Sequence, residues 1–316
     1  MTASTDTAPP RIVAKQRPGD RWFSGTAMFA GSMIVVTLAA VAIFLIVQSL
    51  PAFSADADSA SILTTNFWAY VAPLLFGTIW AAFLALLVAV PLSLGIALFI
   101  THYAPRRLAQ GLGYIVDLLA AVPSVVFGLW GILVFAPSVV PTYKWLNENL
   151  GWIPLFSGQV LNSGRTILTA ALVLAVMVVP IITAICREIF LQTPRLHEEA
   201  ALALGATRWE MIRMAVLPFG RSGIVSASML GLGRALGETM AVAMVLSATG
   251  TVTFQLFTST NPSTIAANIA LTFPEAYDVN INVLIATGLI LFIVTFAVNA
   301  LARFIVSRRK EFSGAN

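Results

Sequence analysis

Charged residues are scarce in this sequence. Only 10% of its 316 residues are Asp, Glu, Lys or Arg, while 58% are hydrophobic. A soluble domain carries about 25% charged residues, so the composition excludes an ordinary soluble globular protein. The uncharged runs exceed the roughly 20 residues that a helix needs to cross a bilayer. We therefore predict an all-α, polytopic membrane protein built as a transmembrane helical bundle.

Cysteine, histidine and lysine are also rare, and each shortage excludes a kind of site. The single cysteine, Cys186, excludes an intrachain disulfide framework and a multi-cysteine metal centre. The two histidines, His102 and His197, form no HExxH cluster, so we predict no metal site. A phosphate-binding P-loop ends in Gly-Lys-Ser/Thr, and none of the three lysines follows a glycine. We predict that the chain carries no cofactor and cannot hydrolyse ATP by itself.

Hydropathy windows of about 19 residues predict six membrane spans. The apolar run behind the polar N-terminal tail is too long for a signal-peptide core, so the first span should remain as an uncleaved anchor. The predicted organisation is a tail at 1–24, a first helix at 25–48, a permease-like domain at 72–305 and a tail at 306–316. The six spans are placed at 25–48, 72–100, 113–136, 167–187, 219–247 and 281–305.

The basic residues lie almost entirely on one side of these spans. Fifteen of the 18 Lys and Arg residues fall there, and only Lys144 and Arg165 fall on the other side. Because Lys and Arg are retained on the cytoplasmic side of short loops, both termini are predicted to be cytoplasmic. The net charge of +4 then needs no nucleic-acid partner. Loops 137–166 and 248–280 are predicted to face outward, where they could meet lipid headgroups or an external partner.

The cytoplasmic loop between spans four and five, residues 193–218, has the pattern of two short helices. Thr193 is predicted to cap the first helix, and Gly205 to end it in the left-handed conformation. Thr207 and Glu210 have the T-x-x-E spacing of a capping box, which predicts the start of a second helix. An amphipathic loop of this kind could also lie on lipid headgroups.

This loop resembles the EAA loop of ABC importer permeases, whose spacing is EAA-x3-G-x9-I-x-LP. The sequence departs from the pattern at Ala215, where the family usually has isoleucine. The resemblance implies a type I importer permease of the MetI-like fold, with cytoplasmic coupling helices that contact a separate ATPase subunit carrying ATP and Mg²⁺. The residues that match the pattern, and that should face the ATPase, are Glu199, Ala200, Ala201, Gly205, Leu217 and Pro218.

Two charged residues, Arg234 and Glu238, lie inside the predicted fifth span. Their spacing of four places them on one face of a continuous helix. A charged residue at the bilayer centre costs about 2.5 to 3.5 kcal/mol, so such residues usually face a pathway or a bundle interior. We predict a substrate pathway, with a structural ion pair as the alternative. Gly233 and Gly237 form a small-xxx-small pattern that predicts close helix packing.

Three segments resemble the C-type permease subunits of bacterial Pst phosphate importers. They read AVPSVVFGLWG at 121–131, LVLAVMVVPIITAICREIF at 172–190 and GRALGETMAV at 233–242. The resemblance implies a non-catalytic inner-membrane permease that forms half of a phosphate pathway, with Arg234 and Glu238 in it. It also implies a second homologous permease, two ATPase subunits and an external phosphate-binding protein as partners.

Other functions remain open at this stage. Sulfate and molybdate permeases carry a similar RALGE run, so another oxyanion is the first alternative. Phosphate near neutral pH retains a proton, which it could donate to Glu238 while accepting from Arg234, whereas sulfate has none to donate. An ion-coupled transporter using Glu238 as a proton carrier is a second alternative. An intramembrane enzyme is disfavoured because the sequence has no G-x-S-x-G elbow.

Overall fold

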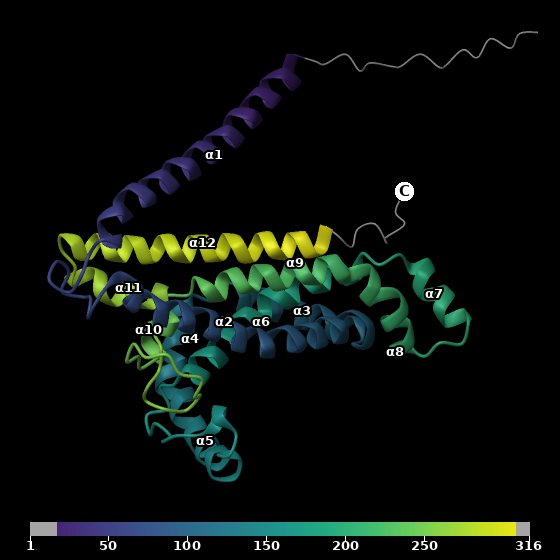
Figure 1. Cartoon of the computed structure of the whole chain (residues 1–316). Coiled ribbons are helices and arrows are strands. Elements are labelled where there is room, and N and C mark those ends of the chain that lie inside the picture. Colours follow the sequence, from purple (N-terminus) through teal and green to yellow (C-terminus); the bar gives the residue numbers. More distant parts are fainter. Residues whose placement is uncertain (1–17, 308–316) are drawn as a thin grey trace, which may run out of the picture. The chain divides into compact units, whose positions relative to one another are not determined.

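The computed structural model describes residues 18–307 (Figure 1). The outer parts of both predicted tails, including Arg308 and Lys310, lie outside this range. The described chain separates into two units, the first ending at Val47 and the second beginning at Gln48. Its two β-bridges are isolated, and its regular structure is helical. The all-α prediction is therefore confirmed for the described part of the chain.

Most helices follow one another through short connections, and the longest connection leads from α10 to α11. Six helices of the described residues are long and apolar enough to cross a membrane, as predicted. In chain order, the elements are α1 (Pro18–Phe53), α2 (Phe67–Leu98), η1 (Phe99–Tyr103), α3 (Arg106–Ala120), α4 (Ser124–Trp130), η2 (Gly131–Phe135), α5 (Ala136–Leu150), η3 (Pro154–Phe156), α6 (Ile167–Leu191), α7 (Arg195–Ala203), α8 (Arg208–Met211), η4 (Ile212–Val216), α9 (Leu217–Leu236), α10 (Met240–Val245), α11 (Ile265–Thr272), η5 (Phe273–Glu275) and α12 (Val279–Ser307).

The first unit is formed by the N-terminal part of α1. The apolar stretch Trp22–Phe53 has a mean hydropathy of 2.7, and its most apolar window contains no buried residue. A helix that is apolar on every side and exposed along its length is suited to lipid contact.

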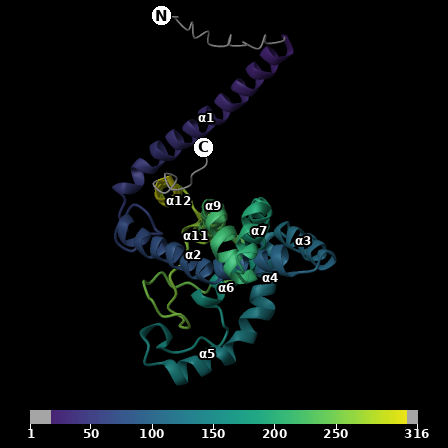
Figure 2. The same cartoon turned by 90° about the vertical axis from the view of Figure 1, so that its right-hand side faces the viewer.

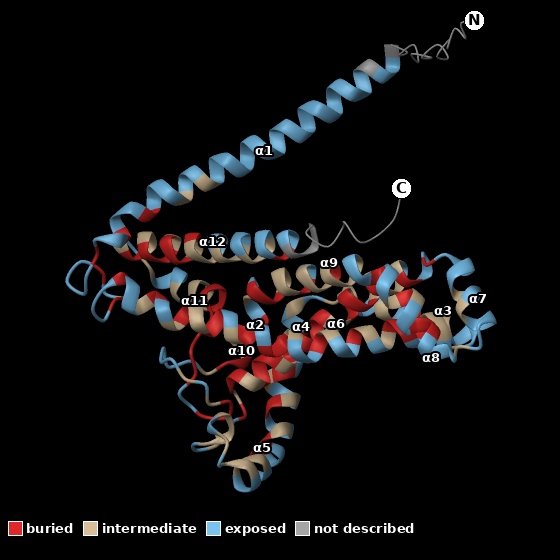
Figure 3. Cartoon of the chain, turned by 45° about the vertical axis from the view of Figure 1, so that its right-hand side comes forward, coloured by how far each residue is buried: buried red, intermediate tan, exposed pale blue. Residues whose placement is uncertain are grey.

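The second unit is a bundle in which α2, α6, α9 and α12 run along a common direction (Figures 1 and 2). Helix α6 is the most buried candidate span, and α2, α3 and α9 all pack against it. Figure 3 shows the buried residues gathered where α2, α6, α9 and α10 meet. Alanines dominate the contact of α2 with α6, which lets the two backbones approach closely. The Ser93 hydroxyl also donates a hydrogen bond across it to the Val179 carbonyl at 3.1 Å.

The third predicted span, 113–136, is wrong as a single helix. Helix α3 ends at Ala120, and α4 begins at Ser124. Pro123 lacks an N–H group and disfavours helical geometry at the residue before it, which explains the break. Figures 1 and 2 show α5 running out of the bundle, away from the direction of α2 and α6.

The two long segments that were predicted to face outward contain helices. Segment 137–166 contains most of α5, and segment 248–280 contains α11. Asn261 stabilises the segment that follows α10. Its Nδ2 donates to the Ser247 and Thr258 carbonyls at 3.0 and 2.9 Å. Its Oδ1 accepts from the Ile167 backbone N–H at 3.1 Å, which ties this segment to the first turn of α6.

Candidate functional site

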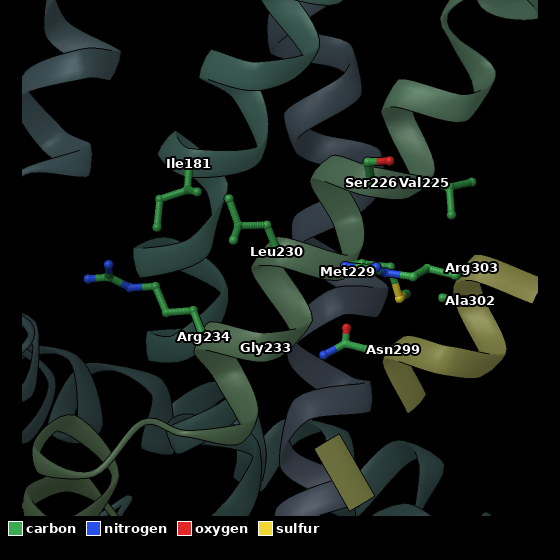
Figure 4. Close-up of a pocket in the computed structure, with 10 residues that line it drawn as sticks. All are labelled: Ile181, Val225, Ser226, Met229, Leu230, Gly233, Arg234, Asn299, Ala302 and Arg303. Carbon is green, nitrogen blue, oxygen red and sulfur yellow. The ribbon is translucent and has the colours of Figure 1, made fainter. Parts of the chain in front are cut away.

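A cavity of about 910 Å³ lies among α6, α9 and α12 (Figure 4). Its lining is apolar apart from Ser226, Arg234, Asn299 and Arg303, and it contains no acidic side chain. The lining residues are Ile181, Val225, Ser226, Met229, Leu230, Gly233, Arg234, Asn299, Ala302 and Arg303.

Arg234 lies in the last turn of α9 and is partly buried. Its Nε atom is buried and has no hydrogen-bond partner among the described residues. No carboxylate lies within 4.0 Å of its guanidinium in this part of the chain. A guanidinium presents a planar fork of donors that matches the oxygens of carboxylates and phosphates. The predicted pathway residue therefore offers unused donors beside a cavity.

Glu238 does not share a helix face with Arg234, so that prediction is wrong. Helix α9 ends at Leu236, and Glu238 lies in the break before α10. Glycine destabilises a helix, and the run around Arg234 contains three of them. The Glu238 side chain is buried, and its Oε1 accepts a hydrogen bond from the Ala241 N–H at 3.1 Å. The carboxylate thus stabilises the first turn of α10.

The small-xxx-small prediction for Gly233 and Gly237 is also wrong within this chain. A Cβ atom on Gly233 would meet nothing within 4 Å, and one on Gly237 would meet only the Gly233 carbonyl. Gly231 makes the close approach instead, because a Cβ there would lie 2.7 Å from Ile182 and Val178 on α6. Gly233 leaves its side of α9 open to the cavity.

The predicted coupling loop, residues 193–218, folds as two helical segments joined at Gly205. Gly205 has a φ of +85°, in the left-handed region, as predicted. The capping box is also confirmed. Thr207 Oγ1 accepts from the Glu210 N–H at 3.3 Å, and Glu210 Oε2 accepts from the Thr207 N–H at 2.7 Å.

Two details of the coupling loop differ from expectation. Thr193 does not cap α7, since its buried hydroxyl has no hydrogen-bond partner in the described range and the cap position is Pro194. The second helix is not separate from the fifth span, because α8, η4 and α9 form one continuous helix. Pro218 cannot donate to the carbonyl four residues earlier, and the π-helical turn η4 lies at that point. Leu217 and Pro218 therefore connect the loop directly to α9.

The loop presents its predicted contact residues to solvent. Glu199, Ala200 and Gly205 are exposed, while Ala201 is half-buried against the core. Beside them Leu204 is 90% exposed and Leu196 is 77% exposed, an arrangement that favours burial by a partner surface.

One side-chain contact between the loop and the bundle, and one ion pair within the bundle, were not predicted from the sequence. His102 Nε2 lies 3.6 Å from Glu198 Oε1 and joins η1 to α7. Arg187 lies 3.3 Å from Asp117 and joins α6 to α3. These partners lie far apart in the chain, so no local spacing could have revealed them.

Residues 89–311 match the family model described as the binding-protein-dependent transport system inner membrane component. This chain belongs to that family. The inner-membrane component is 48% identical to the phosphate transport system permease protein PstC 2 of Mycobacterium tuberculosis, over 96% of this chain and 98% of the relative. It is 46% identical to PstC of Mycobacterium leprae, over 92% and 94% of the two chains. The predicted resemblance is confirmed.

Solved structures support the fold of this inner-membrane component. A chain of the bacterial alginate ABC transporter, solved with an alginate-bound periplasmic protein, aligns with a TM-score of 0.63 at 18% identity. The alignment covers 93% of this chain and 97% of that one. The predicted ABC importer permease fold is therefore confirmed, and the family places the protein in the inner membrane as a multi-pass component of a transport system.

Proposed function

We propose that this chain is the transmembrane permease subunit of an ATP-driven importer of inorganic phosphate. The observation that carries the proposal is the guanidinium of Arg234, which faces a cavity without a carboxylate partner in the described structure. The relatives named as phosphate permeases support phosphate as the substrate.

The two charged residues have different parts in this proposal. Arg234 binds the phosphate oxygens through charge-assisted hydrogen bonds, which are about twice as strong as neutral ones. Glu238 Oε1 is used by the Ala241 backbone, and its Oε2 makes no hydrogen bond within the described residues. That second oxygen is the proposed acceptor for the proton of phosphate. A bound proton favours phosphate over sulfate, which has none to donate.

The proposed importer contains further subunits besides this chain. We propose a second homologous permease, two ATPase subunits holding ATP and Mg²⁺, and an external phosphate-binding protein, with lipid around the spans. ATP binding would close the ATPases and push on α7, which the His102–Glu198 contact links to the extension of α2. The chain itself is non-catalytic in this proposal, and both termini are cytoplasmic.

ATP-dependent uptake tests the proposal directly. Vesicles containing the co-purified complex should take up labelled phosphate only when ATP is present on the side of the membrane where the ATPase subunits lie. Excess sulfate should not compete with phosphate. Uptake of sulfate or molybdate in place of phosphate would contradict the substrate assignment. Uptake driven by a proton gradient after ATP depletion would contradict the ATP-driven mechanism and favour an ion-coupled transporter.

The coupling surface gives a separate prediction. Leu204 is almost fully exposed on the loop, and burying a leucine side chain contributes about 1.5 to 3 kcal/mol. We expect Leu204→Ser to reduce co-purification of the ATPase by about tenfold or more. The matched control is Leu271→Ser on α11, which is 62% exposed at the other end of the bundle (Figure 1). If both variants keep the ATPase equally well, the loop does not dock through Leu204.

A further inference from the structure

A second arginine lines the cavity that contains Arg234. Arg303 lies on α12, and Figure 4 shows its side chain extending toward Met229 on α9. In the same view the Arg234 side chain points away from α12. The two guanidiniums therefore belong to different parts of one cavity.

The charges of this cavity are uncompensated. Its lining contains two arginines and no acid, and neither arginine has a carboxylate within 4.0 Å in the part of the chain that the structure describes. A cleft of one sign with low-dielectric walls concentrates ions of the opposite charge. The cavity therefore favours an anion.

Two neutral polar groups line the same cavity as Arg303. Asn299 precedes it by one helical turn on α12, and Figure 4 shows its amide directed toward α9. Ser226 lies on α9, where its hydroxyl donates to the Ser222 carbonyl at 2.9 Å and keeps lone pairs for a further donor. An amide and a hydroxyl can together accept from and donate to a protonated oxyanion.

Arg303 is an exposed residue next to the last residue of its candidate span. Basic residues at the end of a span commonly lie among lipid headgroups. Arg303 additionally lines a cavity bounded by two other helices of the bundle. Helix α9 also connects without a break to the coupling loop, so this wall would move with that loop.

We infer that Ser226, Asn299 and Arg303 form an inner oxyanion subsite, which receives phosphate from Arg234 before release on the cytoplasmic side. The inference rests on the proposed function, because it names a second binding position on the same pathway. With two separated guanidiniums, the anion moves between two weaker binding sites and does not have to dissociate from one tight site.

Uptake measurements test the subsite. We expect Arg303→Gln to lower ATP-dependent phosphate uptake about tenfold, with ATPase co-purification unchanged. Arg107→Gln removes the same charge from an exposed position at the start of α3 and should retain uptake. If the wild-type complex transports phosphate and the Arg303→Gln and Arg107→Gln variants have equal uptake rates, the subsite is refuted while the proposed function stands.

A chemical probe tests the subsite without transport. Cys186 is the single cysteine of the sequence, so Cys186→Ala gives a cysteine-free chain into which Ser226→Cys adds one exposed thiol. Each reagent's rate in the assembled complex is divided by its rate with a free thiol in solution. On this scale an anionic thiosulfonate should react several-fold faster than a cationic one of similar size, since the arginines concentrate anions. Adding Arg303→Gln should remove most of that preference, whereas Arg107→Gln should preserve it. Equal rates for both reagents, or reaction with neither, would refute an anion-attracting cavity.

Discussion

Replacing Arg234 by alanine should reduce ATP-dependent phosphate uptake by about 10- to 100-fold. Hydrogen bonds to charged groups contribute about 1.5 to 3 kcal/mol, and each 1.4 kcal/mol is a factor of ten. Arg234→Lys should recover only part of the loss, because an ammonium keeps the charge but lacks the planar fork. Labelled-phosphate uptake into vesicles measures both effects.

The stability of the same variant separates a pathway residue from a structural one. Arg234 has no carboxylate partner among the described residues, so its removal should leave no buried acid uncompensated. We expect the thermal midpoint of the Arg234→Ala complex to match that of the wild type. Breaking a buried ion pair would instead cost about 3 to 5 kcal/mol. A large drop in the midpoint, or unchanged uptake, would contradict the pathway role.

Gly77→Ala should be strongly destabilising. Gly77 lies on α2 against segment 248–280, and a Cβ atom there would collide with the Ser263 carbonyl oxygen, which is backbone and cannot rotate away. The next residue, Thr78, accepts a hydrogen bond from the Ile265 N–H at 2.9 Å, so a shift of this segment would also break that contact. Overpacking costs about 1 to 3 kcal/mol and sometimes more. The thermal midpoint of the purified complex should fall accordingly.

The same helix provides the control. Gly95 is exposed, and a Cβ atom on it would meet nothing within 4 Å. Alanine is favoured over glycine in a helix by about 1 kcal/mol, so Gly95→Ala should be neutral or slightly stabilising. If the two variants have equal midpoints, the close contact between α2 and residue 263 does not exist in the assembled protein.

Local chemistry allowed several elements to be predicted. The number of spans follows from the number of uninterrupted apolar runs. The bilayer requires such a run in every spanning helix, however the helices pack against one another. The Thr207–Glu210 capping box and the left-handed Gly205 depend on neighbouring residues alone, and both are present. Thr193 failed as a cap because packing buried its hydroxyl away from the helix start.

Continuity of a helix was harder to predict than its presence. Hydropathy treats residues 219–247 as one apolar run, although the chain breaks after Leu236. After the break, Glu238 satisfies the Ala241 N–H locally, and the tertiary structure packs α10 against α4 and α11. Hydropathy likewise cannot detect that Pro123 turns α4 away from α3.

By itself, the sequence determined the number of membrane-spanning helices, the Thr207–Glu210 capping box, the left-handed Gly205 and the presence of Arg234 within an apolar span, because each depends on residue type and short spacing. The tertiary structure decided which groups meet. It opened a cavity between α9 and α12, brought Arg303 to the cavity of Arg234, separated Glu238 from that arginine's helix face and paired His102 with Glu198. The residues that these contacts bring together lie tens of positions apart in the sequence, and only the packing of the helices fixes them.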